Sequence, residues 1–256
     1  QVLFNIVHNA SIYINNVTKI NNKGNKMKKI ALAILMIFSF SSIVSADIGV
    51  KIGVSAQVGE MTTKATELNR TTNTSESEKI AALLATGSGF IEKDLKFIPI
   101  PIINKISLGY DNIGHNINLG SQNNVRVSDL RGVDENTIVN GNHKLEAEIT
   151  GFKTQYATFN IFDWLYLKAG TVEVDVKTKF TGTPTSAYKT DHTLDGKMYG
   201  IGFERQTDQG FFLRGEYNDY DIDGISVKST GTDSVFTATL ASVSGDTAKI
   251  SIGKAF

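Results

Sequence analysis

The sequence contains no cysteine and only three prolines, one tryptophan and four histidines among its 256 residues. Without cysteine, the chain can form no disulfide, no thiolate metal site and no cysteine nucleophile. The formal net charge is zero, with 26 basic and 26 acidic residues, which argues against nucleic acid as the main partner. A mean hydropathy of −0.10 excludes a bundle of membrane helices, but not a membrane barrel, in which only alternate residues face lipid.

Long apolar runs are also scarce, and the only one lies near the beginning. Met27-Lys28-Lys29 is followed by a largely apolar stretch from Ile30 to Phe40 and then by Val44-Ser45-Ala46. The stretch is shorter than the roughly 20 residues of a membrane helix. A basic start, an apolar centre and a small-residue site predict a signal peptide over 27–46, cleaved after Ala46. The segment 1–26 is interpreted as a non-native upstream extension, and 47–256 as the exported domain.

Alternating apolar and polar residues make up much of the exported part. The clearest alternation runs over 48–59, which is long enough to cross a bilayer as a tilted strand of about 9–11 residues. The final segment, 248–256, alternates as well, except that Lys254 falls on the apolar face, where it could snorkel into the headgroups. The edge strand of a soluble sandwich could show this pattern. A strand at the end of the chain needs a neighbour on its edge, and a closed sheet supplies one.

Eight strands are predicted, joined by connections that alternate between long and short. The short turns are 160–163 and 206–210, and the connection 95–103, which holds Pro99 and Pro101, is expected to lie in the membrane interface. The expected strands are 48–59, 80–93, 106–111, 144–159, 164–177, 198–204, 211–218 and 248–256. The expected long polar loops are 61–79, 115–142, 178–193 and 221–246.

Some faces stay open at this point. Leu83 and Leu84 are adjacent, so the face of 80–93 is undecided and 80–85 could instead form a helical turn. The strand 144–159 changes face, which a bulge near Gly151 would reconcile. The residues Val172, Val174 and Val176 lie on the opposite parity to the apolar residues before them, and are expected above the membrane. Aromatic residues near the short turns predict a girdle: Phe159, Phe162, Trp164, Phe203, Phe211 and Phe256.

Four short segments resemble strands of a known family. The segment Leu165-Tyr-Leu-Lys-Ala-Gly170 is similar to a strand of small outer-membrane barrels of the opacity-protein and OmpA-transmembrane-domain type, and 197–203, 210–217 and 250–256 resemble that family's last three strands. The resemblance implies an all-β, eight-stranded antiparallel up-and-down barrel in the outer membrane of a Gram-negative bacterium, surrounded by outer-membrane lipid and lipopolysaccharide. It also implies that the barrel-assembly machinery reads Phe256 as an assembly signal.

The polar faces of the expected strands carry charges of both signs. The interior of an eight-stranded barrel is just wide enough to be filled by side chains, and a buried charge needs a partner. Glu204 and Arg214 flank one short turn and can meet across the hairpin, with Lys168 on the neighbouring strand. The predicted lumen charge network is Lys51, Lys168, Glu204, Arg214 and Glu216. A lumen plugged in this way predicts a structural or surface-interaction role; the alternative is a narrow porin-like channel for ions or small solutes.

Signatures of catalysis are weak. Barrel hydrolases carry a His and a Ser two residues apart on one strand, and none of His115, His143 and His192 has a serine two positions later. The pair Asp191-His192 could mimic part of a barrel protease's acid–His dyad, but a solvated pair is the simpler interpretation. No phosphate loop or metal signature is present. The sequence therefore predicts a monomeric non-enzyme without metal or cofactor, and it does not identify any surface ligand.

Overall fold

The computed structural model describes residues 48–70, 73–124, 143–181, 191–228 and 236–256. The interpretation of 1–26 and the predicted signal peptide 27–46 lie outside these residues, as do parts of all four expected loops. Within them, the only helical element is a short 3-10 helix, η1 (Ile103–Lys105). No helix in this part of the chain is long and apolar enough to cross a membrane.

The rest of the structure is antiparallel β-sheet. The strands are β1 (Val50–Asn69), β2 (Thr74–Asp94), β3 (Ile106–Ile113), β4 (Ile117–Asn124), β5 (His143–Phe162), β6 (Leu165–Thr181), β7 (Asp191–Gln206), β8 (Phe211–Ile222), β9 (Ile225–Lys228), β10 (Phe236–Leu240) and β11 (Val243–Ala255).

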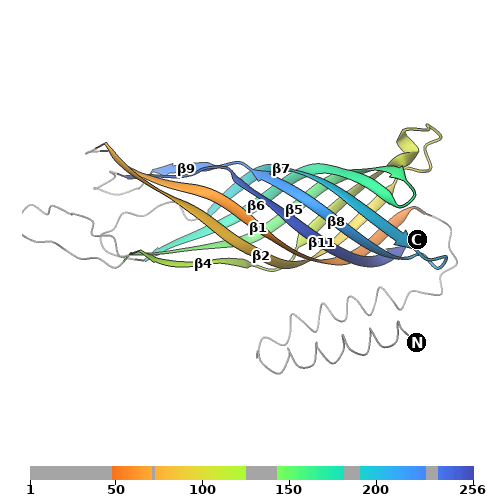
Figure 1. Cartoon of the computed structure of the whole chain (residues 1–256), viewed down its shortest axis with the longest axis horizontal. Coiled ribbons are helices and arrows are strands. Elements are labelled where there is room, and N and C mark those ends of the chain that lie inside the picture. The colour runs from red at the N-terminus through yellow and green to blue at the C-terminus, as the bar shows by residue number, and fades with distance from the viewer. Residues whose placement is uncertain (1–47, 71–72, 125–142, 182–190, 229–235) are drawn as a thin grey trace, which may run out of the picture. The chain divides into compact units, whose positions relative to one another are not determined.

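The sheet closes on itself. Its order is β11-β8-β7-β6-β5-β3-β2-β1, and β1 pairs with β11 from Lys51 opposite Ala255 to Thr62 opposite Ser244. Strand β4 follows β3 along β5, whereas β9 and β10 form a hairpin beyond β8 and β11. The result is the predicted eight-stranded antiparallel up-and-down barrel (Figure 1).

Several strands extend further than the sequence analysis expects. The ladder between β1 and β2 is continuous from Val50 opposite Lys93 to Asn69 opposite Thr74, so the expected polar loop 61–79 is wrong for most of its length. The expected loops 115–142 and 221–246 likewise contain β4, β9 and β10. Beyond the membrane the outer side of a strand meets water, so polar residues such as threonine, a good strand former, suit it. Low hydrophobicity in this part of the chain therefore does not indicate a loop.

The two open face assignments are now decided. Residues 80–85 belong to β2 and form no helical turn. Leu84 is buried inside the barrel, whereas Leu83 points outward and is 89% exposed. The predicted bulge in β5 is present, because its register against β6 shifts between Ile149 and Gly151.

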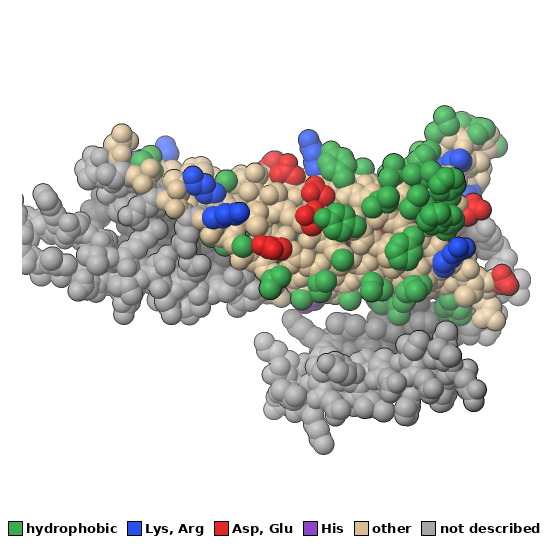
Figure 2. Space-filling model, viewed as in Figure 1, with side chains coloured by type: hydrophobic (Ala, Val, Ile, Leu, Met, Phe, Trp, Pro, Cys, Tyr) green, Lys and Arg blue, Asp and Glu red, His purple; other side chains and the backbone are tan. Residues whose placement is uncertain are grey.

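Apolar side chains cover the outside of the barrel in the half that contains the short turns (Figure 2). Exposed members include Ile250 and Ile252 on β11, Leu213 on β8 and Ile201 on β7. The ring of Trp164 stacks on that of Phe162 at 5.9 Å between centroids. An apolar outer band flanked by aromatic residues is the surface that a barrel presents to lipid. We refer to this band as the lipid-facing belt.

At the lower edge of the belt, Lys254 lies on the outer face as expected but is only 7% exposed. Its Nζ lies 5.3 Å from the ring centroids of both Phe211 and Phe256. The ammonium group thus lies near two aromatic rings, which attract it.

Beyond the belt, the polarity of the two faces is exchanged. On β6, Leu167 faces outward within the belt, but further along the strand Val172 and Val174 face inward and are each 2% exposed. Their outward neighbours there are Thr171 and Glu173, both exposed. The valines keep the inward parity of Lys168, and it is the surroundings of the wall that change from lipid to water. The upper barrel thus has the apolar interior and polar exterior of a soluble protein.

This exchange predicts a large effect for one of two adjacent substitutions and a small effect for the other. Val172→Asp should lower the free energy of unfolding by about 3–5 kcal/mol, because it places an unpaired charge in an apolar interior. Thr171→Asp should have little effect, since Thr171 faces outward opposite Lys197. Urea unfolding of the refolded protein measures both. Equal stability of the two variants would show that the valines do not face a closed interior.

Candidate functional site in the barrel interior

Acidic and basic side chains from several strands converge inside the half of the barrel that the belt surrounds. They point inward because each shares the parity of its strand's lumen face. All are buried except Glu204, which is partly exposed. The set is Lys51, Glu92, Asp94, Asp111, Lys168, Glu204, Arg214, Glu216 and Lys249.

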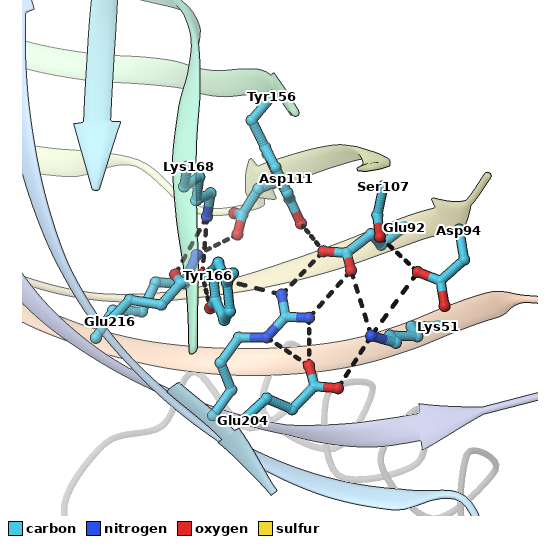
Figure 3. Close-up of polar contacts among 12 residues, drawn as sticks. Lys51, Glu92, Asp94, Ser107, Asp111, Tyr156, Tyr166, Lys168, Glu204 and Glu216 are labelled. Atoms are coloured by element: carbon cyan, nitrogen blue, oxygen red, sulfur yellow. Dashed lines mark hydrogen bonds and ion pairs between the residues drawn. The ribbon is translucent and has the colours of Figure 1, made fainter. Parts of the chain in front are cut away.

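Arg214 on β8 pairs with both Glu92 and Glu204, whose carboxylates point toward the same space inside the barrel (Figure 3). Its Nη1 and Nη2 donate to the two carboxylate oxygens of Glu92 at 2.9 and 3.1 Å. Its Nε and Nη2 also donate to Glu204 Oε2 at 3.0 and 2.6 Å. Glu204 lies directly opposite Arg214 on β7, whereas Glu92 comes from β2. Two carboxylates thus satisfy one guanidinium, whose planar fork suits bidentate pairing.

Lys51 lies beside the carboxylates that Arg214 binds, toward the end of the barrel with the short turns. Its Nζ donates to Glu204 Oε1 at 2.9 Å and lies 3.7 Å from Glu92 and 3.8 Å from Asp94. Asp94 in turn accepts a hydrogen bond from Ser107 at 2.5 Å. These carboxylates share Lys51 as a partner, so the interaction cannot be divided into separate ion pairs.

A second group lies next to the arginine. Lys168 on β6 donates to both oxygens of Glu216 at 3.1 and 3.2 Å. Tyr166 donates to the same carboxylate at 2.6 Å, and Nη1 of Arg214 lies 3.9 Å from it. Lys168 Nζ also lies 3.9 Å from the ring centroid of Tyr156. Lys249 pairs with Asp111 nearby. Each of the five carboxylates therefore pairs with at least one of the four cations, as buried ions require.

Glycines opposite the tyrosines make room for these contacts. A Cβ on Gly202 would lie 2.3 Å from Tyr166 Cζ, and one on Gly109 would lie 2.2 Å from Tyr156 Cζ. The rings lie across the bare backbone, and their hydroxyls then reach Glu216 and Glu92. Glycine in a strand interior often marks such a close approach.

An apolar layer occupies the interior above the charges. It is a single cluster of buried side chains: Ile113, Phe152, Val172, Val174, Leu194, Met198, Tyr220 and Ile222. Phe152 meets Tyr220 edge-on at 5.7 Å between centroids. Between the two layers lies a cavity of about 10 Å³, lined in part by Gln57, Lys168 and Met198, which is about the volume that a single water needs.

The structure brings the five sequence-predicted lumen residues into one connected set, since Lys51, Glu204, Arg214, Glu216 and Lys168 form a continuous chain of contacts. The sequence analysis missed their partners Glu92, Asp94, Asp111 and Lys249. Glu92 was missed because the face of 80–93 was undecided. The parity of β11 already placed Lys249 on the polar face, and that signal could have identified it. Phe256, the other predicted site residue, lies beside Val50, with which its backbone exchanges hydrogen bonds of 2.8 and 3.3 Å.

Groups that could carry catalysis are sparse in the described part of the chain. No group of three His, Cys, Asp or Glu side chains there could hold a metal ion. Asp191 and His192 begin β7, where Asp191 lies 3.9 Å from the ammonium group of Lys177 on the neighbouring strand. His115 accepts a hydrogen bond from the backbone N–H of Gly87 at 3.3 Å.

No protein-family model matches the sequence, and no curated protein matches it either. Solved structures are similar to it. Ail, the attachment invasion locus protein of Yersinia pestis, is 11% identical with a TM-score of 0.31, over 80% of this chain and 99% of that chain. Neisserial surface protein A is 10% identical with a TM-score of 0.34, over 79% and 97%.

The outer-membrane protease OmpT from Escherichia coli is 8% identical with a TM-score of 0.46, over 84% of this chain and 100% of that chain. Likenesses this distant carry no functional argument. The architecture rests on the chain's own ladder and faces: it is a small eight-stranded membrane β-barrel.

The interior predicts a large effect of removing its central cation. Arg214→Ala should lower the free energy of unfolding by about 3–5 kcal/mol, because Glu92 and Glu204 lose their shared partner while still buried. Urea titration of the refolded barrel, followed by its heat-dependent migration on gels, measures the loss. Arg205→Ala is the matched control, since Arg205 follows Glu204 on β7 and its side chain is exposed. A loss no larger than the control's would mean that water reaches the carboxylates.

Proposed function

We propose that this protein is a non-conducting, non-enzymatic scaffold in the outer membrane of a Gram-negative bacterium, with a structural or surface-interaction role. One observation carries the proposal: two different layers occupy the interior, a charge network within the belt and an apolar cluster above it. Ions crossing the barrel would have to break the paired charges and then enter an apolar constriction, which excludes water.

The shape of the upper barrel supports the surface role. Strands β1 and β2 continue beyond the belt to Asn69 and Thr74. Residues 61–69, at about 3.3 Å per residue and a tilt of about 40°, raise the hairpin tip by roughly 20 Å above the lipid. At the base of this extension, Met61 packs against the buried apolar cluster. The strand ends at Asn69 and Thr74 are therefore held away from the membrane, where they can meet other surfaces.

The alternative is a narrow channel, and conductance separates the two. Purified protein in planar bilayers should give no resolved conductance steps, with insertion verified by heat-dependent migration of the recovered protein. Reproducible steps in the wild-type protein, with an ion selectivity that changes in Arg214→Ala, would establish a conducting lumen and refute the scaffold.

Surface display can be tested directly because the chain has no cysteine. A cysteine placed at Ser75, exposed at the start of β2, should react with a membrane-impermeant maleimide on intact cells. The matched variant Asp208→Cys, exposed in the turn between β7 and β8, should react only after the outer membrane is permeabilised. The reverse pattern would show that the barrel has the opposite orientation. Protection of both sites from the maleimide would show that the barrel is not displayed on the cell surface.

The barrel-assembly machinery and the lipid of the outer membrane, including lipopolysaccharide, are the partners that this proposal requires. Phe256 follows the closing strand and pairs with the backbone of Val50. Deleting Phe256 should reduce the amount of folded barrel in the outer membrane with little effect on synthesis, whereas Phe256→Tyr should preserve it, because the aromatic ring remains. Quantitative gels of membrane fractions measure both. Normal insertion of the deleted chain would refute the role of Phe256 as an assembly signal.

A further inference from the structure

The connection between β2 and β3, residues 95–105, is an exposed apolar surface at the end of the barrel with the short turns. Phe97 is 69% exposed, Ile102 is 68% exposed and Ile100 is 48% exposed. The other turns at this end, 163–164 and 207–210, carry no comparable group of aliphatic side chains. Water is a poor environment for such a contiguous patch, so patches of this kind mark contact with membrane or protein.

Part of the backbone of this connection is hydrogen-bonded locally: five of its nine N–H groups donate to carbonyl groups of the connection itself or of Ile106. Leu95 N–H donates to Ile106 C=O at 2.9 Å, Ile98 N–H to Leu95 C=O at 3.0 Å, and Asn104 N–H to Ile100 C=O at 3.0 Å. Two of its residues are prolines, which bring no N–H that would need water. Bonds of this kind lower the cost of moving the backbone out of water, and the remaining N–H groups can bond water at the level of the headgroups.

The connection also continues the lipid-facing belt. It projects sideways from the barrel wall instead of extending along the barrel (Figure 1), and its apolar surface joins the belt (Figure 2). The strands that enter and leave it present Ile91 and Leu108 to the outside, 48% and 51% exposed. A segment that served only to join two strands would not need to spread along the plane of the membrane.

Lysines lie where the connection meets the wall. Lys93 Nζ lies 5.2 Å from the ring centroid of Phe97, and Lys96 Nζ lies 3.4 Å from Asp94. Lys105 is exposed at the end of η1. Apolar tips with ammonium groups beside them match the two environments of an interface, acyl chains and phosphates.

We propose that residues 95–105 form an interfacial anchor in the periplasmic leaflet. Phe97, Ile100 and Ile102 enter the upper acyl-chain region, and Lys96 and Lys105 lie at the lipid phosphates. The occupant of this surface is phospholipid, because the patch is continuous with a surface that already faces lipid. The anchor adds to the hold that the lipid-facing belt already has on the depth of the barrel in the bilayer.

Tryptophan fluorescence tests the depth of the connection. Trp164 is the only tryptophan, so Trp164→Phe provides a silent background for Phe97→Trp. The full protein is refolded into phosphatidylcholine vesicles whose lipids carry bromine either near the headgroup or near the chain end. We expect blue-shifted emission and about twofold stronger quenching by the shallow bromines, as for an aromatic residue in the interface.

Asp208→Trp in the same background is the control, since it lies in a polar turn at the same end. Its emission should be red-shifted and insensitive to brominated lipid. If Phe97→Trp fails to show heat-dependent migration, Ile102→Trp on the same connection gives the same reading. The proposal would be overturned if the folded variants emitted at wavelengths as long as the control does. The patch would then be a candidate contact surface for a protein partner.

Discussion

Hydrocarbon offers no hydrogen-bond partner to a backbone amide, so a sheet that crosses a bilayer has to close on itself. Here closure is the ladder between β1 and β11, two strands from opposite ends of the described chain. Each inward side chain depends on that ladder for its surroundings. Without closure, Lys51 on β1 could not reach Glu204 on β7, and the apolar cluster above would be open to water. The interior is thus a consequence of the wall.

The wall was largely predictable from the sequence. Alternation in 48–59 and 248–256 identified the two closing strands, and the change of parity near Gly151 identified a bulge. Strand segments were predicted as loops where apolar and polar residues do not alternate clearly. Residues 61–79 are mostly polar in sequence and show no clear alternation, so nothing in the local pattern distinguished this hairpin from a loop. The long ladder between β1 and β2 shows that these residues form strands. Such pairing depends on a second segment of the chain and cannot be read from either segment alone.

The site was predictable in part, for the same reason. Arg214 and Glu204 could be predicted because both lie on the inward parity of their strands. Only a short turn separates them in the sequence, so their contact could also be expected. Arg214 and Glu92 are far apart in sequence and on strands separated by β11 and β1. Their meeting depends on barrel radius and strand stagger, which no single segment encodes. Parity also signalled the exchange of polarity on β6, where the valines after Gly170 face inward. The sequence analysis recognised the change but could not assign the valines a neighbour.

The arginine contact with Glu92 has a mechanical consequence. It joins walls that are not neighbours in the sheet, so it acts across the cross-section of the barrel, whereas strand ladders act only along its circumference. A thin ring bonded only around its rim flattens easily, because bending changes no bond length. A strut across the ring resists this bending. The lateral pressure of the bilayer therefore acts on a braced cylinder, and the outline of the barrel in the membrane plane is set by side chains as well as by strand number.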